Sequence, residues 1–267
     1  MRLKDKVAIV VGAGQSPGEG VGNGRATALT FAREGAKVLC VDYNLGSAEE
    51  TVDMIKKSQG TAHAIKADVT KESDIKAFVD DVMKRWGRID ILHNNVGVSI
   101  AGGDAELLSL TEEAFDRCVA INLKSCILAC KHVIPIMRAQ KSGAIVNISS
   151  NAVISTYPYV AYKTTKAAMV SFTEQLAYQN AEYGIRANVI LPGLMNTPMA
   201  VDTRAREFNK PRAQVEAERD AKVPLRRKMG TGWDVANAAL FLASDEASFV
   251  TGVTLPVDGG AGVIRGG

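Results

Sequence analysis

The sequence predicts one α/β domain in which helices cover both faces of a doubly wound, seven-stranded parallel sheet. Short runs rich in Val and Ile alternate with longer stretches of helical periodicity, which is the pattern of stacked βαβ units. A glycine-rich loop follows the first apolar run. The length of 267 residues and the hydrophobic content of 46% suffice for one large core. We therefore predict a single domain over residues 1–267.

The seven strands are expected where the apolar runs are shortest and richest in β-branched residues. In chain order they are Val7 to Val11, Lys37 to Val41, Ala62 to Ala67, Ile89 to Leu92, Ala144 to Ile148, Arg186 to Leu191 and Val253 to Val257. Helices should fill the gaps and end at Gly35, Gly87 and Gly184, where a left-handed residue can terminate them. Residues 193–230 are charged and contain no predicted strand, so we expect a substrate-binding loop or lid there.

Composition excludes several classes of function. The net charge is only +3, whereas a nucleic-acid partner would call for a dense basic stripe. The four cysteines form no CxxC pair and the three histidines are scattered, so we expect reduced thiols and no metal site. The first apolar run, Val7 to Val11, is too short for a signal peptide, and no membrane-spanning run is expected. These features indicate a cytoplasmic protein.

The glycine-rich loop, residues 12–24, is the first candidate binding element. Six of its thirteen residues are glycine, and it lies between a predicted strand and a predicted helix. Glycine allows close approach of the backbone to a ligand, and the N-terminus of the following helix attracts a pyrophosphate. The alternative is a merely flexible loop. The context favours dinucleotide binding, with Gly12 at its start.

Asp42 ends the second predicted strand, followed by Tyr43, where an acidic side chain can accept hydrogen bonds from an adenosine ribose. A 2′-phosphate would be repelled there, so NAD is favoured over NADP. A solvated turn aspartate is the alternative. Asp68, next to Val69, could similarly meet the adenine amine, or could cap a helix.

Tyr162 and Lys166 are one helical turn apart and project from the same helix face. A nearby ammonium group lowers a tyrosine pKa from its usual value of about 10, so that the phenol can exchange a proton with an alcohol. Tyr159 and Lys163 have the same spacing, and an ordinary helix surface would explain either pair. The preceding strand distinguishes them, because it delivers Ser149 and Ser150 to the carboxyl edge of the sheet, where ligands bind in such folds.

These motifs together resemble the short-chain dehydrogenase/reductase family over essentially the whole chain. The matching segments are the glycine loop, residues 94–97 (Asn-Asn-Val-Gly), the Ile-Ser-Ser strand end, residues 162–166, residues 188–197 with Pro192 and Gly193, and residues 257–260. The resemblance implies a Rossmann fold, an NAD cofactor and a homotetramer. The apolar stretch Phe249 to Val257 and the glycine-rich tail could contribute to the interface, or could simply pack.

The resemblance also implies roles for individual residues. Ser150 would hydrogen-bond the reacting oxygen, Tyr162 would transfer its proton, Lys166 would hold the nicotinamide ribose, and Asn122 would complete a tetrad through a water. Asn94, Val96 and Gly97 would line the cofactor after the fourth strand. Pro192, Gly193, the Leu194 backbone and Thr197 would lie near its carboxamide.

Three departures from the family pattern bear on these roles. The glycine loop is about six residues longer than usual and starts after Val11 instead of threonine, so that the final glycines map to Gly22 and Gly24 with Asn23 between them. Val96 replaces the usual alanine. The spacing from serine to tyrosine is one residue short, which Ser149 would restore, although strand alternation favours Ser150.

The expected activity is transfer of a hydride between a secondary alcohol or ketone and NAD. The alternatives are an NADPH-dependent carbonyl or 3-oxoacyl reductase and a catalytically silent nucleotide-binding scaffold. The substrate pocket should involve residues 98–105, residues 152–157 with Tyr157, and the lid. Residues 202–228 hold nine basic and five acidic side chains, so that Arg204, Arg206 and Arg212 are candidate ligands for an anionic substrate. A solvated amphipathic lid is the alternative.

Overall fold

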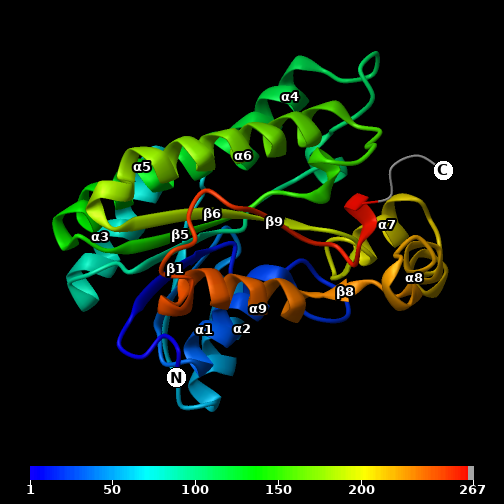
Figure 1. Ribbon diagram of the computed structural model, residues 1–267. Helices are drawn as coiled ribbons and strands as arrows, with labels where there is room; N and C mark the ends of the chain where they lie inside the picture. Colours follow the sequence, from blue (N-terminus) through cyan, green and yellow to red (C-terminus); the bar gives the residue numbers. More distant parts are fainter. Residues whose placement is uncertain (264–267) are drawn as a thin grey trace.

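Seven parallel strands form the central sheet of the computed structural model, which describes residues 1–263 (Figure 1). Their order across the sheet is β3-β2-β1-β4-β5-β6-β9. The strands are β1 (Val7–Val11), β2 (Lys37–Asp42), β3 (Thr61–Lys66), β4 (Ile91–Asn94), β5 (Gly143–Ile148), β6 (Ile185–Pro192) and β9 (Thr254–Val257). All seven predicted strands are therefore confirmed, although β4 begins and ends two residues later than expected. Residues 264–267 of the predicted domain lie outside the described residues.

Helices cover both faces of the sheet, because each face is apolar (Figure 1). One face packs against α1 (Asn23–Arg33), α2 (Leu45–Lys57) and α9 (Gly232–Ala243). The other packs against α3 (Glu72–Trp86), α5 (Ser125–Gln140) and α6 (Val160–Asn180). This arrangement confirms the doubly wound Rossmann fold.

The predicted helix ends follow the expected backbone geometry. Gly35, Gly87 and Gly184 have φ angles of 94°, 72° and 69°. Each glycine lets the chain leave a helix in the left-handed conformation and turn toward the next strand.

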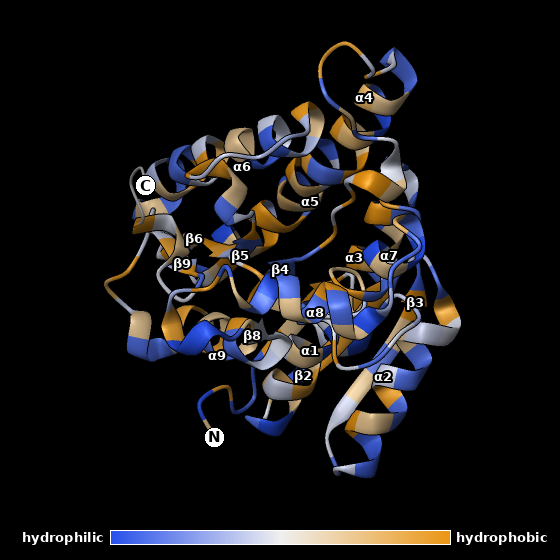
Figure 2. Ribbon diagram, turned by 90° about the vertical axis from the view of Figure 1, so that its right-hand side faces the viewer, coloured by the Kyte–Doolittle hydropathy of each residue, from blue (hydrophilic) through white to orange (hydrophobic). Residues whose placement is uncertain are grey.

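The segment at residues 193–230 does contain strands, which corrects the expectation that it has none. The two-residue strands β7 (Met195–Asn196) and β8 (Gly230–Thr231) pair at its base, and between them lie α7 (Asp202–Glu207) and α8 (Arg212–Asp220). A small apolar cluster of Val201, Val215, Val223 and Met229 holds these helices together. Figure 2 shows that α7 and α8 are largely hydrophilic and lie at one end of the sheet.

A continuous helical stretch, Glu112–Gln140, is long and apolar enough to cross a membrane by length and composition alone. It comprises α4 (Glu112–Val119), a π-helical turn (Ala120–Lys124) and α5. Six residues of α5, including Cys126, Cys130 and Met137, are buried in the domain. A core helix of an α/β domain accounts for this composition.

Candidate active site

Tyr162, Lys166 and Ser150 come together at the carboxyl edge of the sheet. Tyr162 and Lys166 lie one turn apart near the start of α6, with the Lys166 Nζ 5.9 Å from the centre of the Tyr162 ring. Ser150 follows β5, and its hydroxyl interacts with the Tyr162 phenol. An alcohol oxygen placed between the two hydroxyls would be in reach of both.

The Lys166 ammonium is buried and held by backbone carbonyls. Its Nζ donates to the oxygens of Ile148, at 2.7 Å, and Val96, at 3.3 Å. Burial lowers the pKa of Lys166 to about 8. Two of its three N–H groups are used within the protein, which leaves one for a ligand.

Burial dominates the titration of the candidate base. It raises the pKa of Tyr162 to about 12, while the Ser150 hydroxyl and the positive charge of Arg204 lower it. Lys166 is not among the groups that shift this pKa, and its Nζ, 5.9 Å from the ring centre, donates to the Ile148 carbonyl. Further positive charge near the phenol would be needed to ionise it at neutral pH.

Asn122 lies in the π-helical turn between α4 and α5 and is completely buried. Its Oδ1 accepts from the N–H of Val98 at 2.7 Å, and its Nδ2 donates to the Val98 carbonyl and to Thr165 Oγ1. A π-turn leaves helical carbonyls without their usual partners and is common at functional sites. The side chain thus fixes the segment after β4 against α6.

The two alternatives left open by the sequence lie elsewhere. Tyr159 is the N-cap residue of α6, and Lys163 donates to the Ser155 carbonyl at 2.6 Å. The Ser149 hydroxyl donates to the backbone carbonyl of Lys166 at 2.8 Å, away from the phenol. The geometry favours Tyr162, Lys166 and Ser150.

The glycine-rich loop forms a cradle that side chains could not occupy. Gly12 has a φ of 84°, and a Cβ at Gly24 would overlap the Gly12 carbonyl oxygen. Asn95, which the sequence analysis did not single out, donates from Nδ2 to that carbonyl at 3.1 Å. The N-terminus of α1, at Asn23 after Gly22, therefore opens directly onto the turn, as a pyrophosphate site requires.

The extra residues of the loop are organised by side chains that no motif predicted. The Gln15 N–H donates to the Ser47 Oγ, and Gln15 Oε1 accepts from the Gly22 N–H. Arg25 donates to Ser47 and pairs with Glu50 at 2.8 Å. The loop tip turns away from this network toward the lid, where Arg206 donates to the Pro17 carbonyl.

Asp42 lies beside the glycine loop, as expected. Its carboxylate accepts hydrogen bonds from the N–H groups of Gly14, at 2.9 Å, and Asn44, at 3.0 Å. Tyr43 is mostly exposed, with the Lys66 Nζ 5.8 Å from the centre of its ring. The Asp42 carboxylate therefore lies next to the loop, at the position expected for an adenosine ribose.

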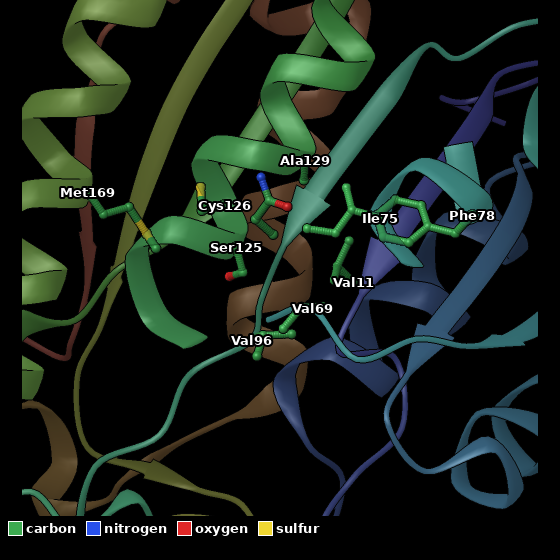
Figure 3. Close-up of a pocket in the computed structure, with 10 residues that line it drawn as sticks. Val11, Val69, Ile75, Phe78, Val96, Ser125, Cys126, Ala129 and Met169 are labelled. Atoms are coloured by element: carbon green, nitrogen blue, oxygen red, sulfur yellow. The ribbon is translucent and has the colours of Figure 1, made fainter. Parts of the chain in front are cut away.

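Val69 and Val96 line a small cavity of about 10 Å³, room for about one water, at the carboxyl edge of β1 (Figure 3). Nearby, Asp68 accepts from the N–H and hydroxyl of Thr70, while Lys71 is the N-cap residue of α3. Asp68 thus stabilises the turn before the helix and is not its cap.

The remaining candidate cofactor-binding residues differ in the contacts that they make within the protein. The Asn94 side chain points into the core and donates to Asn147 Oδ1 at 2.9 Å. A Cβ on Gly97 would lie 3.0 Å from the Lys166 Nζ. Gly193, which follows Pro192, donates from its N–H to the Val257 carbonyl. The Leu194 carbonyl accepts from the Gly230 N–H. Thr197 is buried, and its hydroxyl accepts from the Ala200 N–H.

The candidate substrate residues form two groups: Tyr157 and Arg204 lie near Tyr162, whereas Arg206 is exposed and Arg212 is ion-paired. Tyr157 packs against Tyr162, with ring centres 5.4 Å apart, and its hydroxyl bonds to Ser99. Arg204 is close enough for its charge to lower the pKa of both tyrosines. Arg206 is exposed, and Arg212 pairs with Glu216 at 2.7 Å and Asp202 at 3.3 Å. Arg212 is therefore already neutralised.

The fold and this constellation define an oxidoreductase that uses a nicotinamide dinucleotide. A family model described as enoyl-(acyl carrier protein) reductase matches residues 19–262. A short-chain dehydrogenase/reductase structure from Burkholderia xenovorans is 41% identical, with a TM-score of 0.89 and 99% of each chain covered. The chain belongs to the short-chain dehydrogenase/reductase family.

Relatives whose names indicate opposite directions of the reaction, a reductase and a dehydrogenase, have similar sequence identities to this chain. The 3-oxoacyl-[acyl-carrier-protein] reductase of Thermotoga maritima is 36% identical over 97% of this chain and 99% of its own. The structure of an NAD+-bound xylitol dehydrogenase is 32% identical, with a TM-score of 0.87 over 97% of this chain and 100% of that one. The chain is thus an enzyme that transfers a hydride between an alcohol and a ketone.

Proposed function

We propose that this enzyme oxidises a secondary alcohol with NAD and that Tyr162 is its general base. The observation that carries the proposal is the convergence of Ser150, Tyr162 and the buried Lys166 ammonium at the mouth of the glycine cradle. A bound NAD supplies the acceptor for the hydride. Ser150 donates a hydrogen bond to the alcohol oxygen, and Tyr162 removes its proton.

Lys166 and Asn122 prepare the site for this proton transfer. The remaining N–H of Lys166 binds the ribose next to the phenol, while Ile148 and Val96 hold the ammonium in place. Asn122 holds the Val98 backbone against α6 and supports a proton path through a water. The closed cradle at Gly12 and Gly24 fits a dinucleotide backbone, with Gly22 and Asn23 at the start of α1.

NAD is proposed over NADP because of Asp42. Its carboxylate lies against Gly14, where a 2′-phosphate would meet a like charge. The alternative, an NADPH-dependent 3-oxoacyl reductase, is supported by the name of the Thermotoga maritima relative and by the description of the matching family model. We further propose that Val69 and Val96 flank the adenine, that residues 193–230 act as the lid, and that the enzyme is a cytoplasmic homotetramer.

Matched tyrosine substitutions test the proposal. Tyr162→Phe should abolish NAD reduction in the presence of a panel of secondary alcohols, sugars and hydroxy acids, while NADH binding stays nearly unchanged. Tyr159→Phe is the control and should have a mild effect, because Tyr159 only begins α6. Retained turnover in Tyr162→Phe would refute the assignment.

A further inference from the structure

Arg204 and Arg219 are two lid arginines that are partly buried and have no carboxylate partner among the described residues. Arg204 in α7 donates to the Ala200 carbonyl at 3.0 Å, and Arg219 in α8 approaches the Met229 sulfur with Nε at 3.3 Å. Within residues 1–263, neither guanidinium forms an ion pair with a carboxylate.

Four of the five lid carboxylates are paired with other cations. Lys210 pairs with Glu218, and Lys228 pairs with Asp220. Arg212 pairs with both Glu216 and Asp202. Arg204 and Arg219 therefore carry positive charge that no described carboxylate neutralises, and they differ from the other unpaired lid cations in being partly buried. Those exposed cations are Arg206, Lys222, Arg226 and Arg227.

Both arginines are partly buried and act on each other. Burial, together with the positive charge of Arg204, lowers the pKa of Arg219 to about 10. Two neighbouring cations in a partly desolvated space repel each other, and an anion between them would relieve that repulsion.

The two arginines lie on the active-site side of the lid. Arg204 follows a hydrogen-bonded turn that begins at Thr197, the candidate carboxamide residue. Its charge acts on the hydroxyls of Tyr157 and Tyr162, and Tyr157 in turn acts on Arg219. The cluster therefore borders the space between the catalytic tyrosine and the lid.

We propose that Arg204 and Arg219 together bind an oxyanion group on the substrate, such as a carboxylate, sulfonate or phosphonate, at the end remote from the reacting alcohol. The inference rests on the proposed oxidation of an alcohol at Tyr162. Guanidinium groups suit this role because their paired N–H donors match the oxygens of such anions. Of the nine basic side chains in residues 202–228, these two are the ones that are partly buried and have no carboxylate partner.

Binding to the enzyme–NADH complex tests the site without requiring turnover. The probes share one alcohol skeleton: 3-hydroxybutyrate, 2-hydroxypropane-1-sulfonate, 2-hydroxypropylphosphonate and the neutral methyl 3-hydroxybutyrate. Calorimetry should show binding of at least one anion, at least about tenfold tighter than the ester. The relative affinities of the three anions identify the group preferred.

Arg204→Gln and Arg219→Gln should each weaken anion binding by at least about tenfold. Lys222→Gln removes the same charge from an exposed position of the lid and should change it by less than about twofold. Melting temperatures check that the variants are folded. Failure of all three anions to bind, or equal binding to the double variant Arg204→Gln/Arg219→Gln, would overturn the proposal.

Tyr162→Phe separates this inference from the proposed function. Its NADH complex should bind the anion as the unmodified enzyme does, because the phenol acts on the alcohol proton. Arginine-dependent binding without oxidation of any alcohol would refute the proposed function and leave the anion site standing. Oxidation of alcohols with no dependence on either arginine would refute the anion site alone.

Discussion

The carboxylate of Asp104 accepts a hydrogen bond from the backbone N–H of Tyr162 at 3.0 Å. Its second oxygen accepts from the Ala161 N–H at 2.8 Å, so that one buried side chain binds two of the free N–H groups at the start of α6. Asp104 also lies near Ser99, which bonds to Tyr157. The loop after β4 thereby fixes the start of α6 together with Tyr157 and Tyr162.

Asp104→Asn should lower kcat several-fold and cost about 1 kcal/mol of stability, since an amide replaces a charged acceptor of helix N–H groups. The negative charge of Asp104 raises the pKa of Tyr162. Removing it should move the pH–rate profile for alcohol oxidation to lower pH, because the phenol would ionise more readily. An unchanged profile with reduced stability would assign Asp104 a structural role only.

The sequence predicted the sheet well because every central strand is a short apolar run buried on both faces. It could not predict β7 and β8, since two-residue strands leave no periodicity to detect. Asp104, Asn95 and Arg219 were also missed as individual residues. Their partners lie 10 to 83 positions away along the chain, so that even the motif at residues 94–97, which contains Asn95, does not reveal the contact with Gly12.

The pKa of Tyr162 is another property that the sequence alone could not predict. Helical spacing predicted that Lys166 lies beside the phenol, and it does. Whether the ammonium or burial has the larger effect on the pKa of Tyr162 depends on how α6 packs against the sheet and on which groups accept the hydrogen bonds of the Lys166 Nζ. In this structure burial dominates, a result that requires the tertiary contacts.

Cofactor preference should depend on the charge of Asp42. We expect the unmodified enzyme to favour NAD over NADP by at least about tenfold, because a 2′-phosphate would face a carboxylate at close range. Asp42→Asn should narrow the ratio of kcat/KM values for the two cofactors, and its amide oxygen can still accept from one of the two N–H groups, Gly14 or Asn44, that the carboxylate oxygens now bind separately. Asp42→Ala, which loses those bonds as well, separates charge from loop structure. Equal use of both cofactors by the unmodified enzyme would contradict the role given to Asp42.

His93 should make the protein acid-sensitive. It is completely buried in β4 against Phe31, neither ring nitrogen has a hydrogen-bond partner within residues 1–263, and burial lowers its pKa to about 3. Below pH 6.5 the unfolded chain binds a proton that the folded chain does not, so stability falls as pH falls from about 6.5 toward 3. The slope from this residue is about 1.4 kcal/mol per pH unit.

Urea unfolding across this pH range measures that slope. His93→Leu keeps a side chain of similar size and should flatten the decline, whereas His132→Gln, at a surface pair with Glu72, should not. Identical pH dependence in His93→Leu and the unmodified protein would show that the acid sensitivity arises elsewhere.

Arg212 should couple the lid to the tip of the extended glycine loop. Its guanidinium lies 3.3 Å from Asp202 and 3.8 Å from Glu19, and Asp202 also accepts from the Glu19 N–H at 3.4 Å. The Asp202 side chain is only 12% exposed, so removing its cation leaves a carboxylate that water solvates poorly. Arg212→Gln should therefore lower the free energy of unfolding by about 1–3 kcal/mol and raise KM for NAD.

Lys210→Gln is the control: it breaks an exposed ion pair in the same lid and should lower the free energy of unfolding by less than about 1 kcal/mol. In the double variant Arg212→Gln/Asp202→Asn the stranded charge is gone, so much of the lost stability should return. If the two single effects simply add, the two residues act independently and the lid is not attached to the loop through this pair.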